Sequence, residues 1–174
     1  RISNCSAHAV TLTGRASTGG IIGKAYGSST INNSSVSGYS QITTVSGATN
    51  RPVCVGGIVG WSLDGIIQNS KVNINGNISL GSSVNGYAGG IVGYTNNLVL
   101  NSSVSANISA NKTDGDYAGG IVGYTSGDVN NGVVKNSSVE GYYAGGIGGA
   151  ITSSGSSTFK FNNYTKGYRK EDAS

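Results

Sequence analysis

Short apolar segments alternate with glycine, serine and asparagine along the whole chain. Segments such as GGIVGY (89–94), VLNSSVSANIS (99–109) and VVKNSSVEG (133–141) are rich in β-branched residues and are bounded by Gly, Asn or Ser. This pattern is typical of β-strands. The same residue types disfavour helix in every window. We therefore expect an all-β protein.

One octet is repeated along the chain. YAGGIVGY stands at 87–94 and again at 117–124, and near copies occur at 17–24, 54–61 and 142–150. The Gly-Gly pairs of these octets start at residues 19, 56, 89, 119 and 145. Self-similarity at a period of tens of residues predicts a repeat architecture. The unequal spacing predicts loops of different length on a fixed frame.

A second element, an apolar residue followed by any residue and Asn, lies between the Gly-Gly pairs. It starts at Ile2, Ile31, Ile67, Val99, Val134 and Phe161. Three copies continue as NSSV, at 33–36, 101–104 and 136–139. The two elements together predict a β-solenoid of about five to six coils, built from GGIxG and apolar-x-Asn elements, over residues 1–158. Residues 159–174 would form a terminal coil, a cap or a docking tail.

Equivalent positions of the octets form two columns. The residues two positions before each Gly-Gly pair are Ser17, Cys54, Tyr87, Tyr117 and Tyr143. Those that follow Gly-Ile-x-Gly are Lys24, Trp61, Tyr94, Tyr124 and Ala150. If each repeat is one coil, these columns become ladders in which Trp61, Tyr94 and Tyr124 stack as packing residues. Glycine at strand positions is expected where two backbones approach closely.

These residues carry a family resemblance. The GGIVGY core, followed by a loop and then by I-x-N-C/S-x-A/V as in ISNCSA (2–7), resembles the GLUG-motif repeats, over residues 1–165. Such repeats occur in bacterial surface proteins, adhesin-like proteins and non-catalytic regions of secreted metallopeptidases. The resemblance implies a β-rich repeat on an extracellular protein and does not imply an activity. Gly148 departs from the pattern, since a β-branched residue is usual there.

The composition changes the picture in one respect. Only 10 % of the 174 residues are charged, and 27 Ser, 19 Asn and 13 Thr take the place of the missing charges. This composition without Met is typical of a processed extracellular chain. The net charge of +4 is spread along the sequence, which argues against a nucleic-acid partner. No apolar run reaches the length of a membrane helix, so we expect no membrane insertion.

No residue constellation indicates an enzyme, a metal site or a cofactor. His8 is the only histidine, and the HExxH pattern is absent. Asp114 and Asp116 offer only two carboxylates, too few for a Ca²⁺ loop, and fit a loop tip better. GGIIGKA (19–25) fails as a phosphate-binding loop, because Ala25 follows the Gly-Lys pair. We expect a protein without catalytic residues.

Two kinds of modification can be read from the sequence. N-glycosylation acceptors lie at Asn4, Asn33, Asn77, Asn101, Asn107, Asn111, Asn136 and Asn163, and Asn32 also fits the pattern. Because many of these are the repeated Asn, the solenoid itself explains them through turn hydrogen bonds. Cys5 and Cys54 permit one disulfide without requiring it. Cys54 takes a ladder position, so we expect it to be buried.

Two functional hypotheses follow. In the first, the chain is a structural subunit that associates with itself end to end into an extracellular surface fibre, through unpaired strand edges. In the second, it is an adhesive module excised from a larger adhesin or secreted enzyme. That module would bind glycan or a host surface protein through variable loops at 38–53, 73–86, 105–116 and 126–133.

Overall fold

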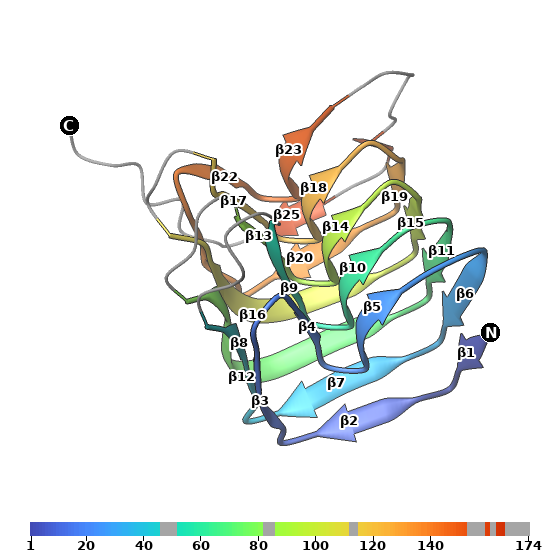
Figure 1. Ribbon diagram of the computed structural model, residues 1–174, viewed down its shortest axis with the longest axis horizontal. Helices are drawn as coiled ribbons and strands as arrows, with labels where there is room; N and C mark the ends of the chain where they lie inside the picture. The colour runs from blue at the N-terminus through green and yellow to red at the C-terminus, as the bar shows by residue number, and fades with distance from the viewer. Residues whose placement is uncertain (46–51, 82–85, 112–114, 153–158, 161–162, 166–174) are drawn as a thin grey trace.

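The chain forms parallel β-strands stacked into sheets. The computed structural model describes residues 1–45, 52–81, 86–111, 115–152, 159–160 and 163–165. These residues contain strands and no helix, and hence none that could cross a bilayer. All the strand pairs are parallel and belong to four sheets, here named A to D. The chain passes through A, B, C and D in that order and then returns to A (Figure 1), which is compatible with a β-solenoid.

Sheets A and B each gain strands at every passage of the chain. Sheet A contains β1 (Ile2–Ser3), β6 (Ser29–Asn32), β11 (Gly65–Gln68), β15 (Leu98–Leu100), β19 (Val129–Asn130) and β24 (Phe159–Lys160). Sheet B contains β2 (Ser6–His8), β3 (Thr11–Gly14), β7 (Ser35–Gly38), β8 (Gln41–Thr44), β12 (Lys71–Leu80), β16 (Ser103–Ser109), β20 (Val133–Lys135), β21 (Val139–Glu140) and β25 (Asn163–Thr165). Strand β12 is long enough to pair with both β7 and β8.

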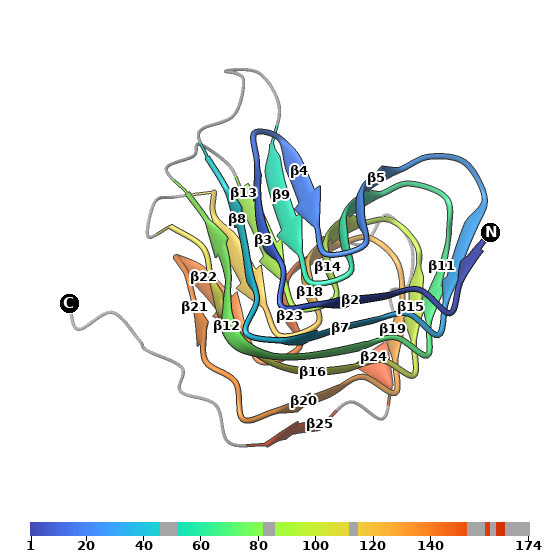
Figure 2. The same ribbon diagram turned by 90° about the horizontal axis from the view of Figure 1, so that it is seen from below.

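Sheets C and D are built from the octets. Sheet C contains β4 (Ser17–Gly19), β9 (Val53–Gly56), β13 (Gly86–Gly89), β17 (Tyr117–Gly119) and β22 (Tyr143–Gly145). Sheet D contains β5 (Ile22–Ala25), β10 (Val59–Ser62), β14 (Val92–Thr95), β18 (Val122–Thr125) and β23 (Gly148–Ile151). Each octet thus contributes to two sheets rather than to one, because a bend after the first Gly divides it into two strands. Figure 2 shows this bend turning the chain inward between β4 and β5.

Close backbone contacts require the glycines of the octet, both in this inward turn and in the strand that follows it. A Cβ on Gly57 would lie 2.2 Å from the carbonyl oxygen of Gly90 and 2.6 Å from Cγ2 of Val72, on the facing sheet B. A Cβ on Gly93 would lie 2.7 Å from the carbonyl oxygen of Gly60 and 2.8 Å from that of Tyr87. No side chain fits in these spaces. The glycine-rich octet thus brings sheets C and D together beside sheet B, as expected for strand glycines.

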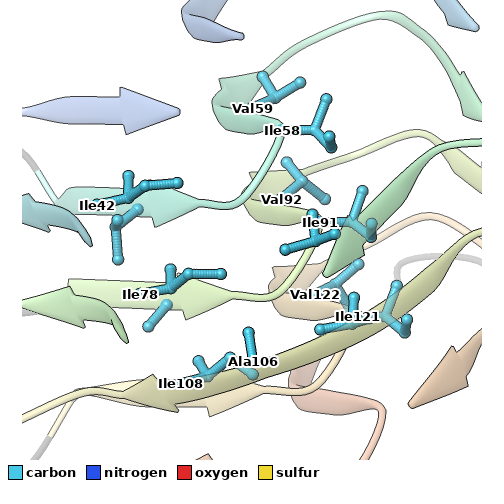
Figure 3. Close-up of a cluster of buried hydrophobic side chains, with 14 of the residues drawn as sticks. Ile42, Ile58, Val59, Ile78, Ile91, Val92, Ala106, Ile108, Ile121 and Val122 are labelled. Carbon is cyan, nitrogen blue, oxygen red and sulfur yellow. The ribbon is translucent and has the colours of Figure 1, made fainter. Parts of the chain in front are cut away.

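Aliphatic side chains fill the interior in columns. Ile58, Ile91 and Ile121, the isoleucines of three successive octets, are fully buried and lie above one another (Figure 3). Ile42, Ile78 and Ile108 form a second column from sheet B, in register with one another. Burying each such side chain contributes roughly 1.5–3 kcal/mol. The core is therefore the same set of contacts repeated from strand to strand.

The register corrects two alignments made from the sequence. Val99 pairs with Val129, and Val134 pairs with Val104. The apolar-x-Asn element of this passage is therefore Val129-Asn130-Asn131, not the one that starts at Val134. The next strand of sheet A starts at Phe159 rather than at Phe161. The NSSV copy at 136–139 lies further along sheet B, where Val139 pairs with Ile108.

Much of the sequence expected to form variable loops is β-structure. Residues 41–44 form β8, residues 73–80 belong to β12 and residues 105–109 belong to β16. The expectation of loops there was wrong, because alternating side chains such as Ile74 and Ile78 point into the core. Residues 46–51, 82–85 and 112–114 of these segments lie outside the described residues.

Candidate functional site: the ladders of the stack

An aromatic array runs along sheets C and D. Its members are Tyr26, Trp61, Tyr87, Tyr94, Tyr117, Tyr124, Tyr142 and Tyr143. On sheet D, Trp61 pairs in register with Tyr94, and Tyr94 with Tyr124, as the sequence columns predict. The Trp61 and Tyr94 ring centroids are 5.9 Å apart and those of Tyr94 and Tyr124 are 5.3 Å apart, with planes inclined by 19° and 12°. These are offset-stacked pairs.

The sheet C column interleaves with that of sheet D. Tyr87, Tyr117 and Tyr143 follow one another in register. The Tyr117 and Tyr143 rings stack with centroids 4.9 Å apart. Across the two sheets, the ring of Tyr87 lies 4.8 Å from that of Tyr124. Neighbouring rings cover much of one another's faces, so the array holds the two sheets together along the stack.

The array ends in a lysine and covers a cysteine. Lys24 continues the sheet D column, and its Nζ lies 3.9 Å from the centroid of the Trp61 ring, a cation–π contact. Cys54 continues the sheet C column and is buried, as expected. Burial raises the pKa of the Cys54 thiol to about 12. Burial raises the pKa of the Tyr87 hydroxyl to about 12 as well, and the neighbouring Cys54 adds a smaller electrostatic effect in the same direction. Such a thiol is inert rather than catalytic.

An asparagine ladder occupies the corner between sheets A and B. Asn4, Asn33, Asn69, Asn101 and Asn131 all have left-handed backbones, with φ between 49° and 58°. Asparagine tolerates this conformation better than most residues. Hydrogen bonds join the amides, from Asn33 Nδ2 to Asn4 Oδ1 (2.8 Å), Asn69 Nδ2 to Asn32 Oδ1 (2.9 Å), Asn101 Nδ2 to Asn69 Oδ1 (3.3 Å) and Asn131 Nδ2 to Asn101 Oδ1 (2.8 Å).

A buried hydroxyl ladder lies directly behind the asparagines. Ser34, Ser70 and Ser102 are each about 1 % exposed. The hydroxyl of Ser70 donates to the carbonyl oxygen of Gln68 (3.0 Å) and that of Ser102 donates to Leu100 (3.0 Å). Cys5 has the equivalent position before β2, and its Sγ donates to the carbonyl oxygen of Ser3 (3.6 Å). The Asn-Cys and Asn-Ser forms of the repeat thus satisfy the same turn. Both cysteines are free thiols.

The glycosylation acceptors occupy several kinds of position in the fold. Asn4, Asn33 and Asn101 belong to the asparagine ladder, where their amides already bond to neighbours. Asn77 and Asn107 are exposed and lie in register on the outer face of sheet B, where the Oδ1 of Asn107 accepts a hydrogen bond from the hydroxyl of Ser138 (2.9 Å). Asn136 is exposed after β20, Asn163 lies in β25, and Asn32 ends β6. Asn111 Nδ2 donates to the carbonyl oxygen of Gly81.

The remaining titratable candidates have structural roles. Exposed His8 contacts the hydroxyl of Ser37 through Nδ1 (3.1 Å). Asp116 is fully buried, and its Oδ1 accepts a hydrogen bond from the backbone of Gly86 (2.7 Å), which ties two successive octets together. Asp114 lies outside the described residues. Within the described part of the chain, no three His, Cys, Asp or Glu side chains gather into a metal-binding group.

Comparison of the chain with protein-family models, with curated proteins and with solved structures gives no match. A functional proposal for this chain therefore rests on the geometry of the ladders. The ladders form a contact surface that is nearly the same from each strand to the next. Sequence reasoning missed Asn131 as a ladder member. Its distance from the preceding Gly-Gly pair would have found it, because Val99 and Val129 each follow such a pair by ten positions.

Proposed function

We propose that the chain is a non-enzymatic structural protein of the cell exterior that stacks end to end into a surface fibre. In this proposal, residues 1–158 form a β-solenoid of about five to six coils, and residues 159–174 form a terminal coil, a cap or a docking tail. The partner is another copy of the same chain. The resemblance to GLUG-motif repeats supports a location on a cell surface.

The observation that carries the proposal is the stacking of like residues in register. Tyr87 pairs with Tyr117, Ala88 with Ala118 and Gly89 with Gly119 in sheet C. Val92 pairs with Val122, Tyr94 with Tyr124 and Thr95 with Thr125 in sheet D. A surface that matches its own copy after a simple translation is complementary to itself. Translation without closure produces open filaments.

All four sheets present a terminal strand on the same side of the stack. In the order of the sheets, β1, β2, β4 and β5 are the end strands of A, B, C and D. Among the described strands, each of these pairs along one edge only, and the other edge can pair with an added strand. A second copy of the chain, or neighbouring residues of a longer one, would meet the same edge.

Electron microscopy of the untagged chain at micromolar concentration tests this proposal. We expect fibres with a regular axial repeat. The double variant Ser6→Pro/His8→Pro should remain as short particles. Its prolines remove N–H groups of β2 that point to the free edge, since Cys5 and Ala9 make the bonds toward β7. The variant Ser6→Thr/His8→Thr is the control and should form fibres. Short particles from the unmodified chain would contradict the proposal.

The alternative of an adhesive module has less support. Its proposed variable loops include β8 and large parts of β12 and β16, which leaves shorter segments for recognition. The aromatic rings present edges rather than free faces over most of the array, because Tyr94 and Tyr124 stack on each other. A sugar needs an open face for stacking. The ladders therefore favour a structural role.

A further inference from the structure

The outer face of sheet B contains a hollow that the ladders do not explain. It has a volume of about 390 Å³ and spans three neighbouring strands, β12, β16 and β20. Lys71 and Asn73 line one side, Ser103 and Ser105 the middle, and Lys135 with Asn136 the other side. The volume lies within the range of small-molecule sites.

Side-chain length explains the shape of the hollow. Lys71 pairs with Ser103, and Ser103 pairs with Val133. The residue opposite Asn73 on β16 is Ser105. Serines thus form the floor along β16, and longer side chains on both neighbouring strands form the walls. The result is an open trough that runs along the strand direction.

The polar groups of the trough have no partners within the part of the chain that the structure describes. The side chains of Lys71, Asn73, Ser103, Ser105, Lys135 and Asn136 make neither a hydrogen bond nor an ion pair there. Two ammonium groups, two hydroxyls and two amides therefore remain available to a ligand. The described residues that line the hollow include no carboxylate.

We propose that this trough binds an acidic polysaccharide through the carboxylates of its sugars. Lys71 and Lys135 lie two strands and two residues apart, so their Cα atoms are separated by roughly 12 Å. This spacing favours an extended ligand with more than one negative charge. The serine hydroxyls and asparagine amides between the lysines match the hydroxyl groups of a sugar. The proposal goes beyond self-association and does not depend on it.

The chemistry of the walls favours a glycan over a nucleic acid. Single-stranded nucleic acids are held by aromatic stacking as well as by charge. None of the described residues that line the trough is aromatic. Its donors are short neutral groups on a rigid sheet, which suit the rim of a sugar ring.

Calorimetric titration with oligogalacturonate of about ten sugars tests the proposal, with neutral malto-oligosaccharide and single-stranded DNA as comparison ligands. We expect binding of the uronate, weakened about tenfold by Lys71→Gln or by Lys135→Gln, since each removes a charged hydrogen-bond donor. Ser105→Val should weaken it also, because it fills the floor. Affinity should fall as salt rises.

Two control variants make the test specific. Lys24→Gln removes the same charge from sheet D, and Ser109→Val makes the same change as Ser105→Val at the other end of β16. Both should bind the uronate with unchanged affinity. Absence of uronate binding would overturn the proposal. The proposal would also be overturned if Lys24→Gln lowered the affinity for the uronate as much as Lys71→Gln does, or if DNA bound more tightly than the uronate. Thermal unfolding of each variant confirms that it is folded.

Discussion

At the scale of single residues, the fold depends on positions where no side chain fits. Gly90 is one of them, because a Cβ there would lie 2.1 Å from the carbonyl oxygen of Gly120 and 2.6 Å from Cγ1 of Val104. Neither neighbour can move far. One is backbone of the next octet, and the other is a buried residue of sheet B. The second Gly of the octet is therefore fixed by packing across the core.

Gly90→Ala should lower the free energy of unfolding by about 2–3 kcal/mol, the upper range for overpacking a core. Gly27→Ala is the matched control. No atom lies within 4 Å of a Cβ at Gly27, and only its left-handed φ of 66° resists the change, at a cost of roughly 1–2 kcal/mol. Urea unfolding monitored by circular dichroism measures both. A smaller loss for Gly90→Ala than for Gly27→Ala would contradict the packing explanation.

At the scale of elements, the corner between sheets A and B depends on asparagine for two separate reasons. The residue must adopt a left-handed backbone, and its amide must bond to the amides above and below. Asn101 does both, with φ at 49°, a donated bond to Asn69 and an accepted bond from Asn131. Glycine at this position would adopt the left-handed backbone but could not form the amide hydrogen bonds. Alanine would do neither.

We therefore expect Asn101→Ala to destabilise the fold more than Asn101→Gly. The expected losses in unfolding free energy are about 2–3 kcal/mol for alanine and about 1 kcal/mol for glycine, from one or two hydrogen bonds and a strained φ. Asn73→Ala, on the exposed face of β12, should change stability by less than about 0.5 kcal/mol. Equal effects of alanine and glycine at Asn101 would show that backbone conformation contributes nothing there.

The elements also show how far sequence reasoning reaches. The columns of Tyr87 and Trp61 were predictable, because the octet repeats its letters and parallel strands in register bring equal letters together. The division of the octet into two strands was not predictable, because the same residues are compatible with a bend at the Gly-Gly pair and with a continuous strand. The trough on sheet B was not predictable either. The repeated NSSV letters align Ser103 with Ser138, whereas the structure pairs Ser103 with Val133.

At the scale of the whole molecule, stability should vary along the stack. Strand β14 pairs on both sides, with β10 and β18, whereas β5 pairs only with β10 among the described strands. Repeat proteins gain stability from the interfaces between neighbours, so an end strand has about half the support of a central one. The ends of the stack are thus expected to open first.

Hydrogen exchange measured by mass spectrometry should show this gradient. In dilute solution, where the chain is not assembled, peptides that cover β14 and β18 should exchange most slowly, and those that cover β1, β2 and β5 fastest. In assembled material, β2 should become as protected as β7. Uniform protection along the chain in dilute solution would contradict the gradient. If the protection of β2 does not change on assembly, fibres form without strand pairing at this edge.

The parallel pairing throughout the four sheets also determines how the molecule would respond to force. The backbone hydrogen bonds point from strand to strand, along the direction in which the strands are stacked. A pull in that direction would load all the interfaces between successive strands equally, and the weakest interface would open before the others. A pull along the strands of sheet B would instead shear many bonds at once. A protein anchored at a surface through one face of sheet B would therefore resist drag better than one pulled from the ends of its stack.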